Sequence, residues 1–220
     1  ERRKSKIWNK GQFTVVGSPT ITDDGVASGF STVKYLNMPV LDLSSGNFTI
    51  ETTFKFIPQS TRQVMWRCAT DAYLGTFGFL IGITPDNKLY TSGVASDITY
   101  STILTEGLYT LKLLVQNGSA KVYLNGNLII NGTYNKTIST AYISIGQAKE
   151  SDPWLGSIDL KQFKIYIDNN LVFDGSAETY VYDPSKFTIV GSPTITEYGV
   201  ASGLDNNNYL DLGITKLNAT

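Results

Sequence analysis

The sequence predicts an all-β protein in which two antiparallel sheets stack as a jelly-roll sandwich, followed by the start of a second copy of the same unit. Three observations support this prediction. Apolar and polar residues alternate along many short segments, which is the period of a strand with one buried face. Turn-forming residues separate these segments. One long stretch of sequence occurs twice in the chain, whereas we find no segment with a helical period.

The repeat defines the expected domain organisation. Residues 13–36 and 187–210 align without a gap and are identical at most positions, so a constant offset takes Phe13 to Phe187. A unit as long as that offset buries enough surface to fold without a metal or a disulfide. We therefore expect four segments, which are a linker or tail of a preceding region at 1–11, the jelly-roll module at 12–175, a linker at 176–186 and a truncated start of the second copy at 187–220.

The composition excludes several classes of function. Charges nearly balance, with 18 basic and 19 acidic side chains, so nothing favours nucleic acid or an anionic membrane surface as a partner. No long apolar run occurs, so we expect no membrane insertion. Histidine is absent, which removes Ser-His-Asp and Cys-His catalysis. The single cysteine, Cys68, cannot form an intramolecular disulfide, and we expect a buried thiol there.

The strands follow from the alternation in chain order. From Phe48 to Phe56, apolar residues occupy nearly every second position and predict the first long strand, with one face in a core. A break in the alternation near Lys161 and Gln162 predicts a β-bulge. Similar patterns predict further strands around residues 64–68, 77–83, 88–91, 109–115, 121–124, 128–130, 158–167 and 171–173.

Turn residues connect these strands. Asn125-Gly126 tolerates the positive φ that a type I′ hairpin requires, and Asp168–Asn170 is expected to close another hairpin. Thr84–Lys88 supplies a turn that begins at a proline.

The repeated motif Val16–Gly29 is rich in glycine and serine, which suggests a phosphate-binding loop as one interpretation. No helix follows it and no lysine closes it, so we interpret it as short opening strands and turns. We expect its Val26–Gly29 edge to pair with the closing strand near Leu171–Phe173.

The order of these segments resembles a known superfamily. The carrying segments are Asn47–Phe56, Phe79–Tyr90, Gly107–Leu128, Ala141–Gly146 and Gly156–Tyr166. Together they resemble the laminin-G-like branch of the concanavalin A-like lectin/glucanase superfamily over residues 12–175. The sequences V-Y-L-N-G (Val122–Gly126) and G-S-I-D (Gly156–Asp159) are the most specific pieces. The sequences of these motifs are also similar to those of modules in tail and appendage proteins of bacteriophages.

The resemblance implies a curved two-sheet sandwich whose rim loops or concave face hold carbohydrate and sometimes calcium. The hydrolases of this superfamily use two carboxylates spaced on one strand, and no such pair occurs here. The strand at Asn47–Phe56 carries only Glu51, which we interpret as solvent-facing. We therefore expect no enzymatic activity from this module.

Sugar recognition requires an aromatic face and a few polar groups. Trp154 and Asp152 lie in one predicted rim loop, and Tyr73 and Asp71 lie in another. We therefore predict these four residues as the ligand-binding set. Trp154 could instead anchor the core, and Tyr73 and Asp71 could serve ordinary loop packing. Calcium is possible, but no spacing identifies a site, so we expect no metal or other cofactor.

Two functional hypotheses remain open. The first is a non-enzymatic carbohydrate-binding or adhesion module, repeated in a phage tail, a virion appendage or a cell-surface protein. Its partners would be a cell-surface glycan and neighbouring copies of the module, with a homo-oligomer possible within a fibre. The second is a purely structural spacer or decoration repeat without a ligand. A glycoside hydrolase is disfavoured by the missing carboxylate pair.

Overall fold

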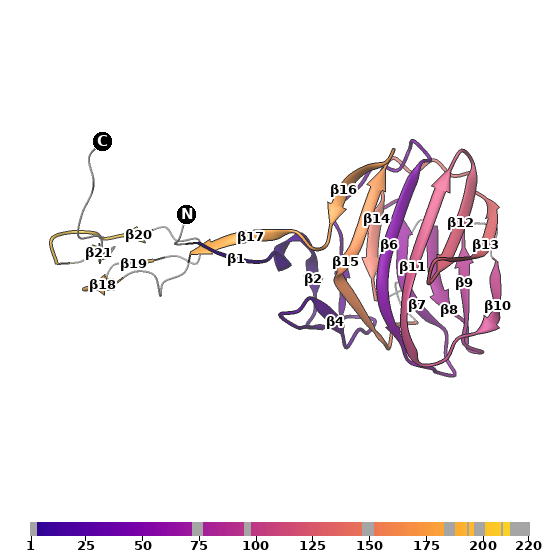
Figure 1. The fold of residues 1–220 in the computed structure, drawn as a ribbon, viewed down its shortest axis with the longest axis horizontal. Helices are drawn as coiled ribbons and strands as arrows, with labels where there is room; N and C mark the ends of the chain where they lie inside the picture. Colours follow the sequence, from indigo (N-terminus) through magenta and orange to yellow (C-terminus); the bar gives the residue numbers. More distant parts are fainter. Residues whose placement is uncertain are drawn as a thin grey trace. The chain divides into compact units, whose positions relative to one another are not determined.

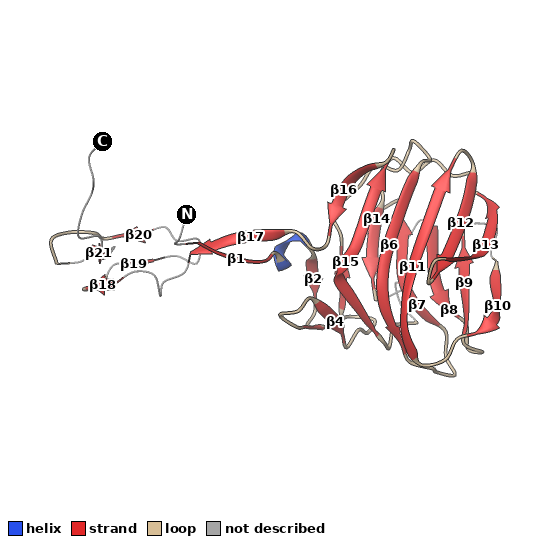
Figure 2. Cartoon of the chain, in the orientation of Figure 1, coloured by secondary structure: helices blue, strands red, loops and turns tan. Residues whose placement is uncertain are grey.

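The computed structural model describes residues 4–71, 77–94, 98–146, 152–182, 188–192, 194–195, 201–207 and 209–211. The chain forms two compact units: Lys10–Ala177, hereafter the module, and a smaller unit made of Glu1–Asn9 with Glu178–Thr220. Strands dominate both units (Figure 2), and the only helical element among the described residues is a 3₁₀ turn at Lys10–Gln12. No helix in the described part of the chain is long and apolar enough to cross a membrane.

The module is a sandwich of two sheets whose strands all pair antiparallel (Figure 1), so the predicted jelly-roll fold is confirmed. The first sheet has eight strands in the order β13 (Asn127–Thr133), β12 (Ser119–Leu124), β11 (Gly107–Gln116), β6 (Phe48–Phe56), β15 (Ser157–Ile167), β4 (Val26–Ser28) and β3 (Thr20–Ile21), with β16 (Asn170–Asp174) beside β15. The second has seven, in the order β10 (Thr99–Ile103), β9 (Lys88–Ser92), β8 (Phe77–Ile83), β7 (Gln63–Ala69), β14 (Tyr142–Ile145), β5 (Tyr35–Asn37) and β2 (Thr14–Val16).

Aromatic rings join the two sheets in the core. Phe48 of β6 stacks on Phe79 of β8 with ring centroids 5.7 Å apart. The same Phe79 ring meets Trp66 of β7 edge-on at 6.0 Å. Along β6 the inward-facing positions are buried and the alternate ones are partly or fully exposed, as the sequence predicts. Each large side chain buried in this way contributes roughly 1.5–3 kcal/mol to folding.

Strand β7 departs from the predicted alternation because it is buried along its whole length. A register shift between Val64 and Trp66 places these two residues out of phase, and Val64 clusters with Leu80 and Tyr90. The chain that follows β14 reaches the side of β7, where the Asp152 carbonyl accepts a hydrogen bond from the Val64 amide at 2.9 Å. The period-2 pattern therefore identified the strand but not the burial of its second face.

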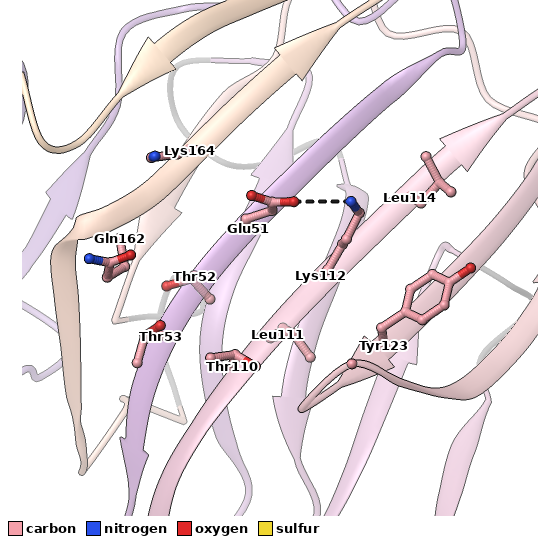
Figure 3. Close-up of a pocket in the computed structure, with 11 residues that line it drawn as sticks. Glu51, Thr52, Thr53, Thr110, Leu111, Lys112, Leu114, Tyr123, Gln162 and Lys164 are labelled. Carbon is pink, nitrogen blue, oxygen red and sulfur yellow. Dashed lines mark ion pairs between the residues drawn. The ribbon is translucent and has the colours of Figure 1, made fainter. Parts of the chain in front are cut away.

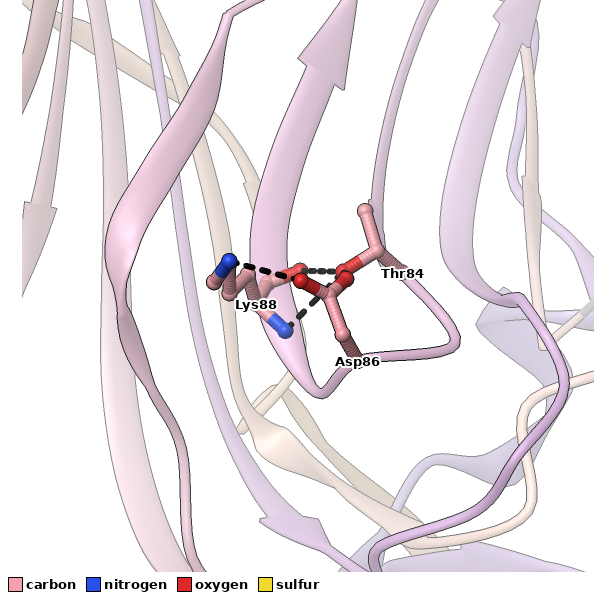
Figure 4. A network of polar contacts seen from close by, with 3 residues as sticks. All are labelled: Thr84, Asp86 and Lys88. Carbon is pink, nitrogen blue, oxygen red and sulfur yellow. Dashed lines mark hydrogen bonds and ion pairs between the residues drawn. The ribbon is translucent and has the colours of Figure 1, made fainter.

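Short polar turns close the hairpins as their chemistry predicts. Asn125 and Gly126 both have positive φ, at 49° and 79°. In the turn between β8 and β9, the Thr84 hydroxyl donates to an Asp86 carboxylate oxygen at 2.5 Å (Figure 4). The Lys88 ammonium lies 2.6 Å from the other oxygen of that carboxylate. These two contacts, that of Lys88 foremost, hold the pKa of Asp86 below its usual value.

Two further predictions concern strand β15. Its register against β6 shifts between Asp159 and Lys164, which confirms the predicted bulge near Lys161 and Gln162. The Asp159 carboxylate accepts the Lys161 amide at 3.0 Å within that bulge. The predicted partner of the Val26–Gly29 edge is wrong, because β4 pairs with β15 through Ala27 and Ile158 and not with Leu171–Phe173.

The smaller unit repeats the register of the module's opening strands. Val15 pairs with Leu36 in the module, and their repeat equivalents Ile189 and Leu210 pair in the smaller unit. The second hairpin, β3 with β4, also recurs at the same offset. The strands of the second copy are β18 (Thr188–Val190), β19 (Thr194–Ile195), β20 (Ala201–Ser202) and β21 (Tyr209–Asp211).

The free energy of unfolding should fall as the pH rises from about 9 towards about 12. Burial raises the pKa of the Cys68 thiol from its ordinary 9.0 to about 12 and that of the Tyr90 phenol from 10.0 to about 12. Over this range the unfolded chain releases protons that the folded chain keeps, so alkali favours unfolding. Urea titrations at several pH values measure the decline, and Tyr90→Phe should reduce it. A flat profile up to pH 12 would contradict this assignment.

Candidate functional site

A groove of about 510 Å³ lies on the outer face of the eight-stranded sheet and crosses β15, β6, β11 and β12. Figure 3 shows Lys164 and Gln162 on one side of it and Tyr123 on the other, with Glu51 and Lys112 between them. We call this recess the sheet groove. Its lining consists of Glu51, Thr52, Thr53, Thr110, Leu111, Lys112, Leu114, Tyr123, Gly126, Gln162 and Lys164.

The recess arises from side-chain size and from the bulge in β15. Thr53 and Thr110 lie opposite each other on β6 and β11, and their short side chains form a low floor. Longer side chains stand on both sides, including Tyr123 on β12. On the β15 side, the pairing with β6 passes from Asp159 to Lys164 across the bulge that contains Gln162. The bulge therefore supplies one wall of the groove.

One row of the sheet carries the charged groups of the groove. In the register, Glu51 of β6 lies opposite Lys112 of β11 on one side and opposite Lys164 of β15 on the other. Lys112 in turn lies opposite Tyr123 of β12. With strands about 4.8 Å apart, this row spans roughly 14 Å from Tyr123 to Lys164. The row is long enough to contact a short chain of linked sugars or another elongated polar ligand.

The charged pair in the centre is accessible and weakly held. The Lys112 ammonium lies 3.1 Å from a Glu51 carboxylate oxygen, and their side chains are 44% and 34% exposed. An exposed pair of this kind contributes only about 0–1 kcal/mol. A ligand can therefore take up hydrogen bonds from either group at small cost.

The V-Y-L-N-G sequence builds the end of the groove near the β12–β13 hairpin. Val122 is buried in the core, which directs Tyr123 to the opposite face of the strand. Asn125 folds the turn back onto β11, because its side-chain oxygen accepts the Thr110 amide at 2.8 Å and its own amide donates to the Thr110 carbonyl at 2.8 Å. This motif signalled Tyr123, which the candidate set from the sequence omits.

Smaller hollows extend the recess along β11. Two of them, of about 50 and 110 Å³, share Leu114 with the sheet groove. The larger of the two also reaches Asn47, which lines a further hollow of about 350 Å³ beside Asn117 and Tyr134 at the sheet's rim. Shallow polar recesses thus follow the strand direction from the middle of the sheet to its edge.

The predicted stacking residue Trp154 is a core residue, which corrects its assignment to a ligand site. Its side chain is fully buried. It meets the Phe54 ring edge-on at 5.4 Å and lies 6.3 Å from the Phe56 ring. An indole enclosed on all sides cannot present a face to a sugar.

Two of the other three predicted residues, Asp152 and Asp71, lie in the described part of the chain. The Asp152 carboxylate accepts a hydrogen bond from the Arg62 Nε at 2.8 Å and pairs with the Arg62 Nη2 as well. Asp71 follows β7 and interacts electrostatically with Arg67. Tyr73 lies outside the described residues. Asp152 therefore has a structural partner in Arg62.

No group of three or more His, Cys, Asp or Glu side chains that could hold a metal ion occurs within the described ranges. The sheet groove likewise has a single carboxylate, Glu51, among its described lining residues. Its chemistry is therefore that of hydrogen bonding and ring contact. Glu51 accepts, Lys112 and Lys164 donate, Gln162 does both, and Tyr123 offers an aromatic face.

Comparison with known proteins places the fold but not a family. No protein-family model matches the sequence, and no curated protein matches it. Domain 4 of an extracellular GH43 arabinanase from Geobacillus stearothermophilus, solved with arabinotriose, has a TM-score of 0.54 and 20% identity over 73% of this chain and 84% of that one. The binding domain of botulinum neurotoxin DC, in complex with SialylT, has a TM-score of 0.52 and 14% identity over 74% and 43%.

A sialidase from Trypanosoma rangeli is also similar, with a TM-score of 0.55 and 10% identity over 72% of this chain. This chain covers only 27% of the sialidase and less than half of the neurotoxin domain. At these identities the likeness concerns the fold alone. The module shares its jelly-roll sandwich fold with these domains.

Trp154→Ala should destabilise the module by about 3–5 kcal/mol, because it opens a cavity between Phe54 and Phe56. Tyr123→Ala removes an aromatic ring of the outer face and should cost about 1 kcal/mol or less. Chemical denaturation of both variants beside the unaltered chain measures the difference. Equal losses of stability would contradict the placement of Trp154 in the core and of Tyr123 on the surface.

Proposed function

We propose that the module binds carbohydrate in the sheet groove, without altering it chemically. The observation that carries this proposal is the row Tyr123–Lys112–Glu51–Lys164, which combines an aromatic face with hydrogen-bonding groups above a floor of short threonines. Sugars present an apolar ring face and a rim of hydroxyls, and this pairing of groups matches both. The sheet groove thus takes the place of Trp154 and its loop as the expected contact for a glycan.

The absence of catalysis is part of the proposal. Glycoside hydrolysis uses two carboxyl groups about 5–10 Å apart on either side of the scissile bond. Glu51 is the only carboxylate among the described residues lining the groove, and its cross-strand neighbours on both sides are lysines. A lysine ammonium is not a carboxyl group, so neither neighbour supplies the second carboxyl that the reaction requires.

The surroundings of the groove favour a short linear glycan over a single sugar. The row crosses four strands, and the hollows that share Leu114 and Asn47 extend it towards the rim. The arabinanase domain of similar fold was solved with arabinotriose, which is a ligand of that kind. Weak binding by one groove is compatible with function in a repeated chain, because linked sites raise avidity by roughly 10²–10⁴.

The setting that we propose is outside the cell, as a repeated binding module of a phage tail, a virion appendage or a surface protein. The duplicated segment supports this setting, as does the similarity of the module's sequence motifs to those of phage tail and appendage modules. A cell-surface glycan would be the partner there.

A glycan array probed with the full chain should identify a bound oligosaccharide, and Tyr123→Ala should weaken its binding roughly 2- to 12-fold, since contact with an aromatic ring contributes about 0.5–1.5 kcal/mol. Tyr166→Ala is the matched control, because Tyr166 lies on the same sheet but does not line the groove. Equal losses in the two variants would argue against the groove.

The array also separates the two functional classes. Silence against all glycans, with and without calcium, would favour a spacer role for the module. Release of reducing ends from any bound glycan would contradict the non-enzymatic part of the proposal and leave the binding part intact.

Lys164→Ala should weaken binding of the same glycan several-fold, because Lys164 is a hydrogen-bond donor at one end of the row. Lys55→Ala is its control. Lys55 lies on the neighbouring strand β6, pairs with Glu106 at 3.1 Å and does not line the groove. Isothermal titration with both variants measures the two affinities. An effect of Lys55→Ala as large as that of Lys164→Ala would exclude a specific role for the row.

A further inference from the structure

The strands on either side of the module are equivalent positions of the repeat. Strand β1 (Lys4–Trp8) precedes the module, and β17 (Glu178–Tyr182) follows it. The offset that takes Phe13 to Phe187 in the duplicated segment also takes Lys4 to Glu178. Strand β17 therefore stands before the second copy as β1 stands before the first.

These two equivalent strands pair with each other, antiparallel, in a symmetric register. Lys6 lies opposite Tyr180, which is its own repeat equivalent. On either side the register is reciprocal: Lys4 pairs with Tyr182, and Trp8 pairs with Glu178, the repeat equivalent of Lys4. An antiparallel pair centred on equivalent residues is the arrangement that two copies of one element adopt about a two-fold axis.

The module lowers the entropic cost of this pairing. A two-stranded ribbon alone is marginal in water, and closing a loop of about 170 flexible residues would cost several kcal/mol. The folded module holds its own two ends together. The Gln12 side-chain amide donates to the Gly175 carbonyl at 2.8 Å, and the Phe13 and Phe173 rings meet edge-on at 5.2 Å. The effective loop is therefore only a few residues on each side.

We propose that the short strand in front of each copy is a self-recognition element, whose partner is the equivalent strand of the neighbouring copy. The two copies are then joined by a ribbon of paired strands, and the chain enters and leaves the module at neighbouring positions. This goes beyond carbohydrate binding and does not depend on it. It also changes the interpretation of residues 1–11, predicted as a linker or the tail of a preceding region, and of residues 176–186, predicted as a linker.

Paired cysteines in the full chain test the register. Cys68→Ala first removes the one native thiol. Lys6→Cys with Tyr180→Cys, and Ser5→Cys with Val181→Cys, place thiols at two adjacent in-register pairs. One pair of the two is of the non-hydrogen-bonded type, whose residues lie about 4.5 Å apart and suit a disulfide.

The matched control moves one thiol along its strand while keeping the chemistry. Lys4→Cys with Tyr180→Cys places the thiols on a diagonal, about 7–8 Å apart, beyond the usual reach of a disulfide. We expect at least one in-register variant to form an intramolecular disulfide in a redox buffer at least tenfold faster than the diagonal variant. Thermal melts of the reduced variants test whether the module, which contains neither strand, remains folded.

Three outcomes would overturn the proposal. Equal rates for in-register and diagonal pairs would show two flexible tails that meet at random. Disulfides that form only between molecules, with rates that rise with concentration, would place the partner in another chain. Failure of both in-register pairs in a folded protein would show that the strands do not pair. Glycan binding is not measured in any of these arms, so their result is separate from that of the sheet groove.

Discussion

The alternation of strand β6 is the constraint on which both faces of the eight-stranded sheet depend. Phe54 and Phe56 are buried on one side, where Phe54 packs against Trp154. Because successive side chains of a strand point to opposite faces, that burial directs Glu51 and Thr53 outward. A slip of one residue would exchange the two sets and place a carboxylate in the core, at a cost of several kcal/mol. The core thus fixes the position of the groove residues on this strand.

The strands on either side of β6 bring further polar side chains beside its outward-facing residues. Antiparallel pairing on both sides places Lys112 and Lys164 opposite Glu51, although both lysines are far from it along the chain. The bulge in β15 accommodates extra residues without breaking the sheet, and it turns a flat surface into a recess at Gln162. Bulges commonly re-aim side chains beside functional sites, and this one does so beside the charged row.

The repeat and the groove support each other in the proposed function. In the proposed role, an accessible groove with weakly held charges would bind a glycan with modest affinity, and linked copies would compensate by avidity. The symmetric pairing of β1 with β17 gives the duplication a physical connection that a flexible tether lacks. The recurring register of the opening hairpins shows that the second copy begins as the first does.

The sequence by itself determined the features that depend on neighbours along the chain. The alternation from Phe48 to Phe56 identified β6. The Asn125-Gly126 pair identified the β12–β13 hairpin, and the repeat identified the duplicated strands. The bulge near Gln162 was also visible, because it interrupts a local period. The alternation of apolar residues and the choice of turn residues are local properties of the sequence. The repeat is found by direct comparison of two segments of the sequence.

Tertiary structure alone decided where the aromatic and charged residues lie. Trp154 has the composition of a sugar platform, yet the packing of Phe54 and Phe56 encloses it, and Arg62 from a distant loop holds Asp152. Tyr123 belongs to a motif that the sequence singles out, but its place beside Lys112 depends on the pairing of β12 with β11. Which face of a side chain meets solvent, and which charges become neighbours, depends on the pairing of strands far apart in sequence, and no local pattern encodes that pairing.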